Sequence, residues 1–596
     1  MNLNMLIAPS YSAFHVRPRT IVLIILTMLL YIVKTTMSDF TYQPRRAPPN
    51  LQKFERTVKN ILKCRNVPAA SIALVRDNIV LLSKNYGYAD PERQIPSNRN
   101  TKFCIGSLTK AFTAVILSKI LSEHPNVTWE TSVKSILGDE FRLSDDVRTD
   151  LVNIQDLLSH RVGTPAYFNA LLVGFPEDVT REKLIRRLRF MPAVAPFRSK
   201  FMYSNYMYTL AGYVAETLSG KSWETLVKEY MLTPLKMTTS GFINERTDFK
   251  DIALPCAVKH GKLINLDPIL LQSVHPCGPA GSLFSTSDDM ARWLLMLLSS
   301  GRDMSNKEVF KSDVLEQTFK PVMPLPFPDQ DLHRTRYPIA DVQMSYDLGW
   351  VTSYYRGYKK IWHSGGITTH SSRLWFYPEN NVGVYAAVNG PQTREKIYAL
   401  RALMSYASDM LLGEEPWLND TTVCTFPAPW GVRADIKEPK ISRDIAGEIR
   451  LRPSTDLVGR YFHLGFGEIR VYFGKRGALV LHFGRFGTMV LNQEKGLLFS
   501  GKYFGPLWFV TDSDDSFEPE KVRFVRSGGK TTGLYFHVDP AYNASFFKKG
   551  RMPIIWLENK NSKNTSERPC ISGSISAWTN VFELMFLCLV IGCKLI

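Results

Sequence analysis

The chain lacks the sequence features of several common protein classes. Its eight cysteines include no C-x-x-C pair, which argues against zinc ribbons and thioredoxin-like redox sites. Lys and Arg outnumber Asp and Glu by 73 to 55, yet no nucleic-acid-binding motif accompanies this excess. The apolar runs near the two ends, residues 21–33 and 584–593, are short for membrane-spanning helices. We expect no metal, no organic cofactor and no nucleic-acid partner.

The chain is long and apolar enough for a large enzyme, and its N-terminus is typical of a targeting segment. Its 596 residues are 45% apolar, which supplies a sizeable core and allows several domains. His15, Arg17 and Arg19 precede the apolar run at residues 21–33. Residues 1–37 are therefore predicted to be a signal peptide, with an uncleaved signal anchor as the alternative.

The C-terminal residues 558–596 combine a polar linker with a hydrophobic tail. The small residues Ser-Gly-Ser at 572–574, a spacer and the tail resemble a GPI-attachment signal, although Glu583 and Lys594 depart from that pattern. A marginal anchor helix and a tail packed against the protein are the alternatives. The protein is expected to be secreted or to lie on the extracellular face of a membrane, with anchorage through either terminus.

Secretion would place the chain in an oxidising compartment and, in a eukaryote, make its sequons glycosylation candidates. Disulfide bonds are expected among the cysteines outside the tail, with their connectivity open, whereas Cys104 lies on an apolar stretch and is expected in the core. The six cysteines are Cys64, Cys104, Cys256, Cys277, Cys424 and Cys570. The four candidate glycosylation sites are Asn126, Asn419, Asn543 and Asn564.

Three short motifs, in this order, predict an acyl-transfer site. They are S-x-x-K at Ser107 and Lys110, Y-x-N at Tyr203 and Asn205, and H-x-G at His363 and Gly365. A lysine three residues after a serine lies one helical turn along the same face, so its amine reaches the hydroxyl. A serine needs such a neighbour to act as a nucleophile at neutral pH, and a helix N-terminus adds positive potential. The arrangement suits attack on an ester or amide carbonyl.

No single motif carries this prediction, because both S-x-x-K and Y-x-N occur elsewhere in the chain. The repeats are Ser527 with Lys530, Ser545 with Lys548, and Tyr167 with Asn169. The first pair falls in a predicted hairpin turn and the second in a predicted strand. All three pairs are expected to be unrelated to catalysis.

The sequence around the motifs resembles a known family. The blocks that carry the resemblance are RNTKFCIGSLTKAFTA, NIQDLLSHRVGTP, FMYSNYMYTLAGYVAE, GPAGSLFSTSDDMARW, YDLGW and WHSGGITTHSSRLWFYPENNVGVYAAVNG. Together they resemble the serine β-lactamase and penicillin-binding-protein superfamily, in its class C β-lactamase-like, esterase-like branch. The resemblance implies an α/β fold in which an antiparallel sheet is flanked by helices. A helical subdomain would hold the tyrosine motif, with the active site between the two.

The resemblance also implies a role for each motif residue. Ser107 would be the acylated nucleophile, and Lys110 would hold its proton network. Tyr203 would act as a general base with its phenolate stabilised by Lys110, since an unperturbed tyrosine titrates near pH ~10. Asn205 would bind substrate amide groups and Lys110.

The strand that carries WHSGG would complete the site. Ser364 and Gly365 would line the substrate, and the backbone N–H groups of Ser107 and Gly366 would form the oxyanion hole. His363 stands where β-lactamases of this fold usually carry the lysine of Lys-Thr-Gly. A histidine is largely neutral at pH 7, so β-lactam hydrolysis is disfavoured, and activity should change across about pH 5.5–7.5 if His363 titrates normally.

Three further residues belong to the same blocks. Phe197 stands where relatives commonly have glycine, which would alter the loop before the tyrosine motif. His160 matches a family block, yet it is expected to be structural. His370 is also expected to be a structural histidine.

Residues 51–415 are predicted to form the catalytic domain, 416–454 a proline-containing linker, and 455–557 a small β-domain. In GEIRVYFGKRGALVLHFG, alternating apolar residues flank a glycine-containing turn, which predicts a β-hairpin with Phe473 on its apolar side. LWFVTD, KVRFVR and GLYFHV are interpreted as further strands. The domain resembles the lipocalin-like barrel appended to some members of this superfamily.

The sequence thus predicts a secreted or surface-anchored serine hydrolase that acts through an acyl-enzyme on a small ester, peptide or amide. One alternative is an extracellular binding or matrix protein that keeps the fold with little turnover. The other is a true β-lactamase or D,D-carboxypeptidase.

Overall fold

The computed structural model describes residues 48–326, 337–430, 455–514 and 516–553. The two predicted targeting segments, most of the predicted linker, and Asn564 and Cys570 lie outside these residues. Within the described ranges, no helix is both long and apolar enough to cross a bilayer.

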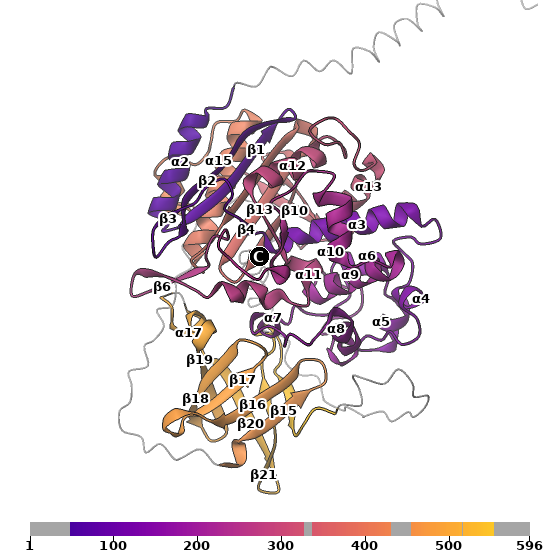
Figure 1. Cartoon of the computed structure of the whole chain (residues 1–596), viewed down its shortest axis with the longest axis vertical. Coiled ribbons are helices and arrows are strands. Elements are labelled where there is room, and N and C mark those ends of the chain that lie inside the picture. Colours follow the sequence, from indigo (N-terminus) through magenta and orange to yellow (C-terminus); the bar gives the residue numbers. More distant parts are fainter. Residues whose placement is uncertain (1–47, 327–336, 431–454, 515, 554–596) are drawn as a thin grey trace, which may run out of the picture. The chain divides into compact units, whose positions relative to one another are not determined.

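A nine-stranded antiparallel sheet forms the centre of the catalytic part (Figure 1). Its strand order is β3-β2-β1-β14-β13-β12-β11-β10-β9, so the first strands of the chain pair with strands some 300 residues later. The strands are β1 Ala69–Arg76, β2 Ile79–Asp90, β3 Ile95–Pro96, β9 Met323–Pro324, β10 Asp341–Tyr346, β11 Val351–Tyr355, β12 Tyr358–Ile367, β13 His370–Tyr377 and β14 Val382–Val388.

Both faces of this sheet are covered. In β1, Ile72 and Leu74 belong to one hydrophobic core, whereas Ala73 and Val75 belong to the other, so seven of the eight strand residues are buried. This explains why the strand appears in the sequence as a continuous apolar run rather than an alternating one.

Helices α2 (Leu51–Cys64) and α15 (Arg394–Leu412) pack on one face (Figure 1). The side chain of Asn50 caps α2, whose buried Phe54, Val58, Ile61 and Leu62 recur at the spacing of one helix face. A disulfide between Cys64 and Cys424 joins the end of α2 to α16 (Thr422–Thr425). The expected disulfide is therefore present in one instance, while Cys104, Cys256 and Cys277 are buried free thiols.

The opposite face is covered by helices that include α12, and a helical subdomain packs around α3. Because α3 is buried on nearly all sides, its apolar residues do not form a single stripe. The helices of this side are α3 Thr109–Glu123, α4 Val133–Leu137, α5 Asp146–Leu151, α6 Ile154–Leu158, α7 Phe168–Leu172, α8 Arg181–Arg187, α9 Asn205–Ser219, α10 Trp223–Val227, α11 Gly278–Gly281, α12 Ser287–Leu298 and α13 Ser312–Glu316.

Two small antiparallel sheets complete the catalytic part. β8 (Leu283–Ser285) pairs with β4 (Phe103–Cys104) and β5 (Gly241–Phe242), and β6 (Cys256–Lys259) forms a hairpin with β7 (Lys262–Asn265). The predicted fold class, an antiparallel sheet flanked by helices, is confirmed.

The C-terminal β-domain is a closed eight-stranded barrel, as its resemblance implied. Its interior is filled by buried apolar side chains such as Ile469, Leu481, Phe524 and Phe547. The strands are β15 Gly459–His463, β16 Gly467–Phe473, β17 Leu479–Phe483, β18 Gly487–Lys495, β19 Leu498–Phe504, β20 Glu520–Ser527, β21 Lys530–Phe536 and β22 Ser545–Lys549.

Two details of the barrel differ from expectation. The run LWFVTD is not a strand: a turn that begins at Gly505, with φ +69, leads into the short helix α17 (Phe509–Asp512). A short apolar run is compatible with a strand or a helix. Here the turn that contains Gly505 and Pro506 ends the preceding strand, and a helix follows it. Phe473 is 39% exposed because it lies at the end of β16, where the alternation no longer faces the interior.

The repeated motif Tyr167-x-Asn169 lies where the barrel contacts the catalytic part. Asn169 donates its backbone N–H to the carbonyl of Val538 at 3.0 Å, and its Nδ2 donates to Glu520 Oε1 and to the carbonyl of His537, both at 2.9 Å. Burial raises the pKa of Glu520 to about 7. The Tyr167 ring packs 4.7 Å from that of Phe466. Tyr167 and Asn169 therefore help to hold the barrel against the catalytic part.

We predict that Asn169→Ala destabilises the protein by about 1–3 kcal/mol, because it leaves the buried Glu520 carboxyl and the His537 carbonyl without their donor. Chemical denaturation followed by tryptophan fluorescence measures the change. Asn492→Ala, on an exposed position of β18, is the matched control and should change the free energy of unfolding by less than about 0.5 kcal/mol. Equal effects of the two substitutions would contradict a docking role.

Candidate active site

Ser107 lies in a single 3-10 turn, Gly106–Leu108, between β4 and α3. It is 4% exposed, and the helix that follows it starts at Thr109. Gly106 has φ +52, and a Cβ there would lie 2.5 Å from the backbone nitrogen of Gly366. Only glycine permits this approach, which brings the serine turn next to strand β12.

Lys110 is fully buried, and its Nζ has three polar neighbours. They are Ser107 Oγ at 3.0 Å, Asn205 Oδ1 at 2.6 Å and the carbonyl oxygen of Ala280 in α11 at 2.8 Å. Desolvation by burial holds the pKa of Lys110 well below its usual range, which favours the neutral amine. A neutral amine has two N–H donors and one lone pair. Asn205 Oδ1 and the Ala280 carbonyl can only accept, so the lone pair is left for the hydroxyl proton of Ser107.

Asn205 is the first residue of α9, which places its side chain against α3. Tyr203 precedes the helix in extended chain, and its ring centroid lies 4.7 Å from Lys110 Nζ. The S-x-x-K and Y-x-N motifs are nearly 100 residues apart in the sequence, yet side chains from both motifs lie next to the amine of Lys110.

Strand β12 places the third motif beside the serine turn. A Cβ at Gly365 would lie 1.9 Å from the carbonyl oxygen of Ile105, so this position also requires glycine. Ser372 Oγ on the neighbouring strand β13 donates to the same carbonyl at 2.7 Å and fixes the turn to the sheet. Ser364 is paired with Arg373 in the register of β12 and β13.

His363 is buried, and both of its ring nitrogens have partners. Nδ1 donates to the carbonyl of Ser364 at 2.6 Å, and Nε2 accepts from the hydroxyl of Tyr346 at 3.0 Å. Desolvation by burial is the main cause that lowers the pKa of His363, to about 3. The expected titration between pH 5.5 and 7.5 is therefore wrong, because desolvation keeps the ring neutral throughout that range.

The remaining predicted residues are located as follows. His370 donates Nε2–H to the carbonyl of Ala253 and accepts the N–H of Cys104 at Nδ1, which agrees with a structural role. Phe197 lies in the loop before the tyrosine motif, beside Arg198, whose φ is +58. The sequons at Asn126, Asn419 and Asn543 are exposed.

The two repeats of the S-x-x-K motif do not form a comparable arrangement. Ser527 ends β20 and Lys530 begins β21, with the turn glycines Gly528 and Gly529 between them. Ser545 begins β22, which also contains its lysine partner. Both belong to the barrel, as predicted. Sequence reasoning missed two contributors, the Ala280 carbonyl and the Tyr346 hydroxyl, although both lie in the blocks GPAGS and YDLGW.

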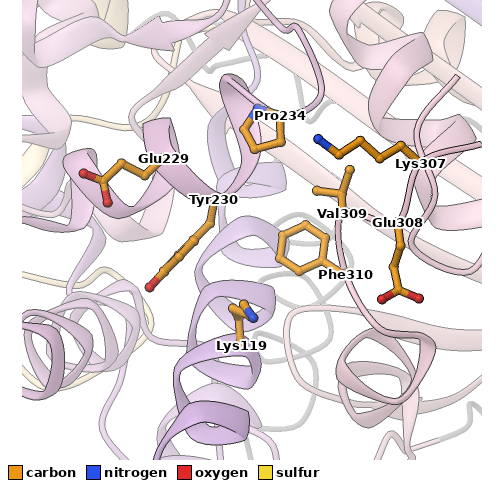
Figure 2. Close-up of a pocket in the computed structure, with 8 residues that line it drawn as sticks. All are labelled: Lys119, Glu229, Tyr230, Pro234, Lys307, Glu308, Val309 and Phe310. Atoms are coloured by element: carbon orange, nitrogen blue, oxygen red, sulfur yellow. The ribbon is translucent and has the colours of Figure 1, made fainter. Parts of the chain in front are cut away.

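A separate pocket of about 230 Å³ lies at the other end of α3 (Figure 2). Lys119, which lines it, is nine residues beyond Lys110 and therefore about 13 Å further along the helix axis. Lys119 forms an ion pair with Glu123, and Glu229 forms one with Lys221. The pocket is thus a charged surface hollow apart from the serine site.

The beta-lactamase family model matches residues 54–408, which is more than half of the chain. The chain belongs to the beta-lactamase family. The matched segment contains all three motifs, and relatives of the chain include proteins named as hydrolases.

Two curated relatives and one solved structure are similar to the chain. Unguisins hydrolase ungD' of Aspergillus campestris (strain IBT 28561) is 30% identical over 376 residues, 61% of this chain and 66% of that protein. Protein flp of Staphylococcus aureus (strain COL) is 24% identical over 350 residues, 57% of this chain and 63% of that protein. The chain therefore spans less than two thirds of the length of these relatives. The octameric penicillin-binding protein homologue from Pyrococcus abyssi has a TM-score of 0.52 at 21% identity, over 84% of this chain and all of that one, which shows the fold.

The lowered pKa of His363 predicts that this residue causes no change in turnover between pH 5.5 and 7.5. It also predicts a stability effect. The unfolded chain takes up a proton on His363 below its ordinary pKa of ~6.5 while the folded protein does not, so stability falls as pH falls from about 6.5 toward 3, by up to about 1.4 kcal/mol per pH unit.

Urea unfolding at pH 7 and pH 5, compared between wild type and His363→Gln, measures this effect. The wild type should lose about 1–2 kcal/mol more than the variant over that interval. An inflection in the pH profile of turnover near pH 6.5 that disappears in His363→Gln would contradict the buried, neutral ring.

Proposed function

We propose that the protein is a serine hydrolase that cleaves an ester or amide through an acyl-enzyme on Ser107. The observation that carries the proposal is the buried amine of Lys110, which lies 3.0 Å from Ser107 Oγ and has its two N–H donors directed to other acceptors. A serine hydroxyl in contact with a buried, neutral lysine is a base-activated nucleophile.

In the acylation step, Ser107 Oγ attacks the substrate carbonyl while its proton moves to Lys110 Nζ. The carbonyl carbon gains a bond to Oγ, and its oxygen becomes an oxyanion. The backbone N–H groups of Ser107 and Gly366 are the donors proposed for that oxyanion, supported by the contact of the serine turn with β12. The tetrahedral intermediate then collapses: the carbonyl re-forms, the bond between its carbon and the leaving group breaks, and the ammonium formed on Lys110 supplies the proton that the leaving group takes up.

Tyr203 is proposed to carry that proton to the leaving group, and to act as the base for water in deacylation. Its ring lies beside Lys110 Nζ, so a phenolate there would be stabilised by the ammonium. Asn205 is proposed to bind the substrate amide with its Nδ2, because its Oδ1 is held by Lys110.

The proposed substrate is uncharged next to the scissile bond. A lysine at position 363 would offer a permanent cation to a substrate carboxylate, whereas His363 is neutral and has both nitrogens engaged. Neutral esters, peptides and amides therefore fit this site better than β-lactams, which carry a carboxylate. The true β-lactamase or D,D-carboxypeptidase is accordingly the weaker candidate.

We further propose that the protein acts outside the cell or on a membrane surface. The Cys64–Cys424 disulfide and the exposed sequons at Asn126, Asn419 and Asn543 support passage through an oxidising secretory route. The alternative of a low-activity binding or matrix protein is disfavoured by the retained contacts of Lys110, which a mere scaffold does not need.

We predict that a serine-directed fluorophosphonate probe labels the wild-type protein and that Ser107→Ala abolishes labelling, because the Ser107 hydroxyl lies 3.0 Å from the Lys110 amine that activates it. Gel fluorescence and mass spectrometry of the labelled peptide give the readout. Ser545→Ala is the matched control, since Ser545 also has a lysine three residues later, and it should retain full labelling. Labelling that survives Ser107→Ala would remove the nucleophile assignment.

We predict that the wild type hydrolyses a neutral aryl ester with a kcat/KM at least about tenfold above that for a cephalosporin reporter, because His363 presents a neutral ring where a lysine would attract the carboxylate. His363→Lys should shift the ratio toward the cephalosporin. A wild type that prefers the cephalosporin, with a ratio that lysine leaves unchanged, would support the β-lactamase alternative instead.

A further inference from the structure

His160 holds the residues on both sides of Tyr203. It lies two residues beyond the end of α6, is fully buried and has φ +58, in the left-handed region. Its backbone carbonyl accepts the N–H of Met202 at 2.7 Å, and its Nδ1 accepts the N–H of Ser204 at 3.0 Å. Tyr203 is therefore fixed between two hydrogen bonds to one residue.

The imidazole also packs directly on the tyrosine ring. The centroids of the His160 and Tyr203 rings are 4.3 Å apart, and Tyr346 and Tyr208 lie 4.7 and 5.0 Å away. Tyr346 is the residue that donates to His363, and Lys110 Nζ lies 4.7 Å from the Tyr203 centroid. His160 thus contacts the ring that the proposed proton transfers use.

The hydrogen bonds specify the form of the imidazole. Because Nδ1 accepts the N–H of Ser204, the ring proton must be on Nε2. Desolvation by burial holds the pKa of His160 well below its usual range, so the ring is neutral. Nε2 is buried and has no hydrogen-bond partner among the residues that the structure describes.

An unpartnered buried donor is unfavourable, so packing alone would be served better by a phenyl ring. The one contribution of His160 that a phenyl ring cannot supply is the acceptor for the backbone N–H of Ser204, which directly precedes α9 and Asn205. A histidine at this position keeps the Nδ1 acceptor, although its Nε2–H is left without a partner. This indicates that the position of the Y-x-N motif has to be held accurately.

We propose that His160 is a positioning residue for Tyr203, holding its backbone through Met202 and Ser204 and its ring by stacking. This inference rests on the proposed function and adds a residue that acts through the Y-x-N motif. The structural role expected for His160 is thereby given a catalytic consequence.

Two substitutions separate the acceptor from the packing. His160→Phe keeps an aromatic ring but removes the acceptor for Ser204, and it should lower kcat for an aryl ester by about 10²-fold with KM changed less than about threefold. His160→Asn keeps an oxygen acceptor near the Nδ1 position and tolerates positive φ, so it should recover most of the lost kcat. In a Tyr203→Phe background, His160→Phe should cause little further loss.

His463→Phe is the matched control. His463 is also largely buried, accepts backbone N–H groups at Nδ1 and stacks on Phe466, but it lies in the barrel. Its substitution should leave kcat unchanged. Circular dichroism and thermal unfolding establish that each variant is folded before kinetics are measured.

The outcomes are distinct. A folded His160→Phe with wild-type kcat, or a full additional loss in the Tyr203→Phe background, overturns the positioning role. Failure of both His160 variants to fold also overturns it, by showing that the residue serves the fold. If the wild type is labelled by the serine probe, these results concern His160 alone; if it is not labelled, the proposed function fails, and this inference with it.

Discussion

The burial of one amine constrains the rest of this site. An ammonium in the interior is costly unless it is paired, and no carboxylate bonds to Lys110 in the described residues. The structure resolves this by placing two carbonyl-type acceptors and one hydroxyl around Nζ, a set that satisfies a neutral amine. The acceptors come from α9 and α11, the hydroxyl from the turn before α3, and the amine from α3 itself, so the three helices must meet at one point. The surrounding helical core of apolar residues keeps water away from that point.

A second constraint is the close approach of backbones at the serine turn. Gly106 faces Gly366, and Gly365 faces the carbonyl of Ile105, at separations that no side chain would allow. Strand β12 can therefore lie directly against the turn that carries Ser107. The same strand presents His363, whose neutral form follows from burial. The electrostatic character of the site thus depends on one buried base and on a neutral histidine at position 363.

The segment from His160 to Asn169 connects this site with the barrel. One end stacks on Tyr203 and the other bonds to Glu520 and His537. The barrel interior is filled with apolar side chains, so its contribution to the described structure is a packed surface that holds this segment. The motif Tyr167-x-Asn169 takes no part in the serine site; its residues contact the barrel instead.

The sequence alone determined the local elements and the identity of the motif residues. The spacing of Ser107 and Lys110 on a helix start and the turn glycines of the barrel hairpin act over a few residues, so their consequences can be derived without a structure. The run LWFVTD was misassigned because a short apolar stretch suits strand and helix equally. Only the tertiary structure decided that the amine of Lys110 is hydrogen-bonded to the carbonyl of Ala280. It also decided that His363 is neutral and hydrogen-bonded to the hydroxyl of Tyr346. Finally, it decided that His160 accepts hydrogen bonds from the residues on both sides of Tyr203. Desolvation and hydrogen-bond partners come from residues far apart in the sequence, and burial, which no local pattern specifies, decides the protonation of each group.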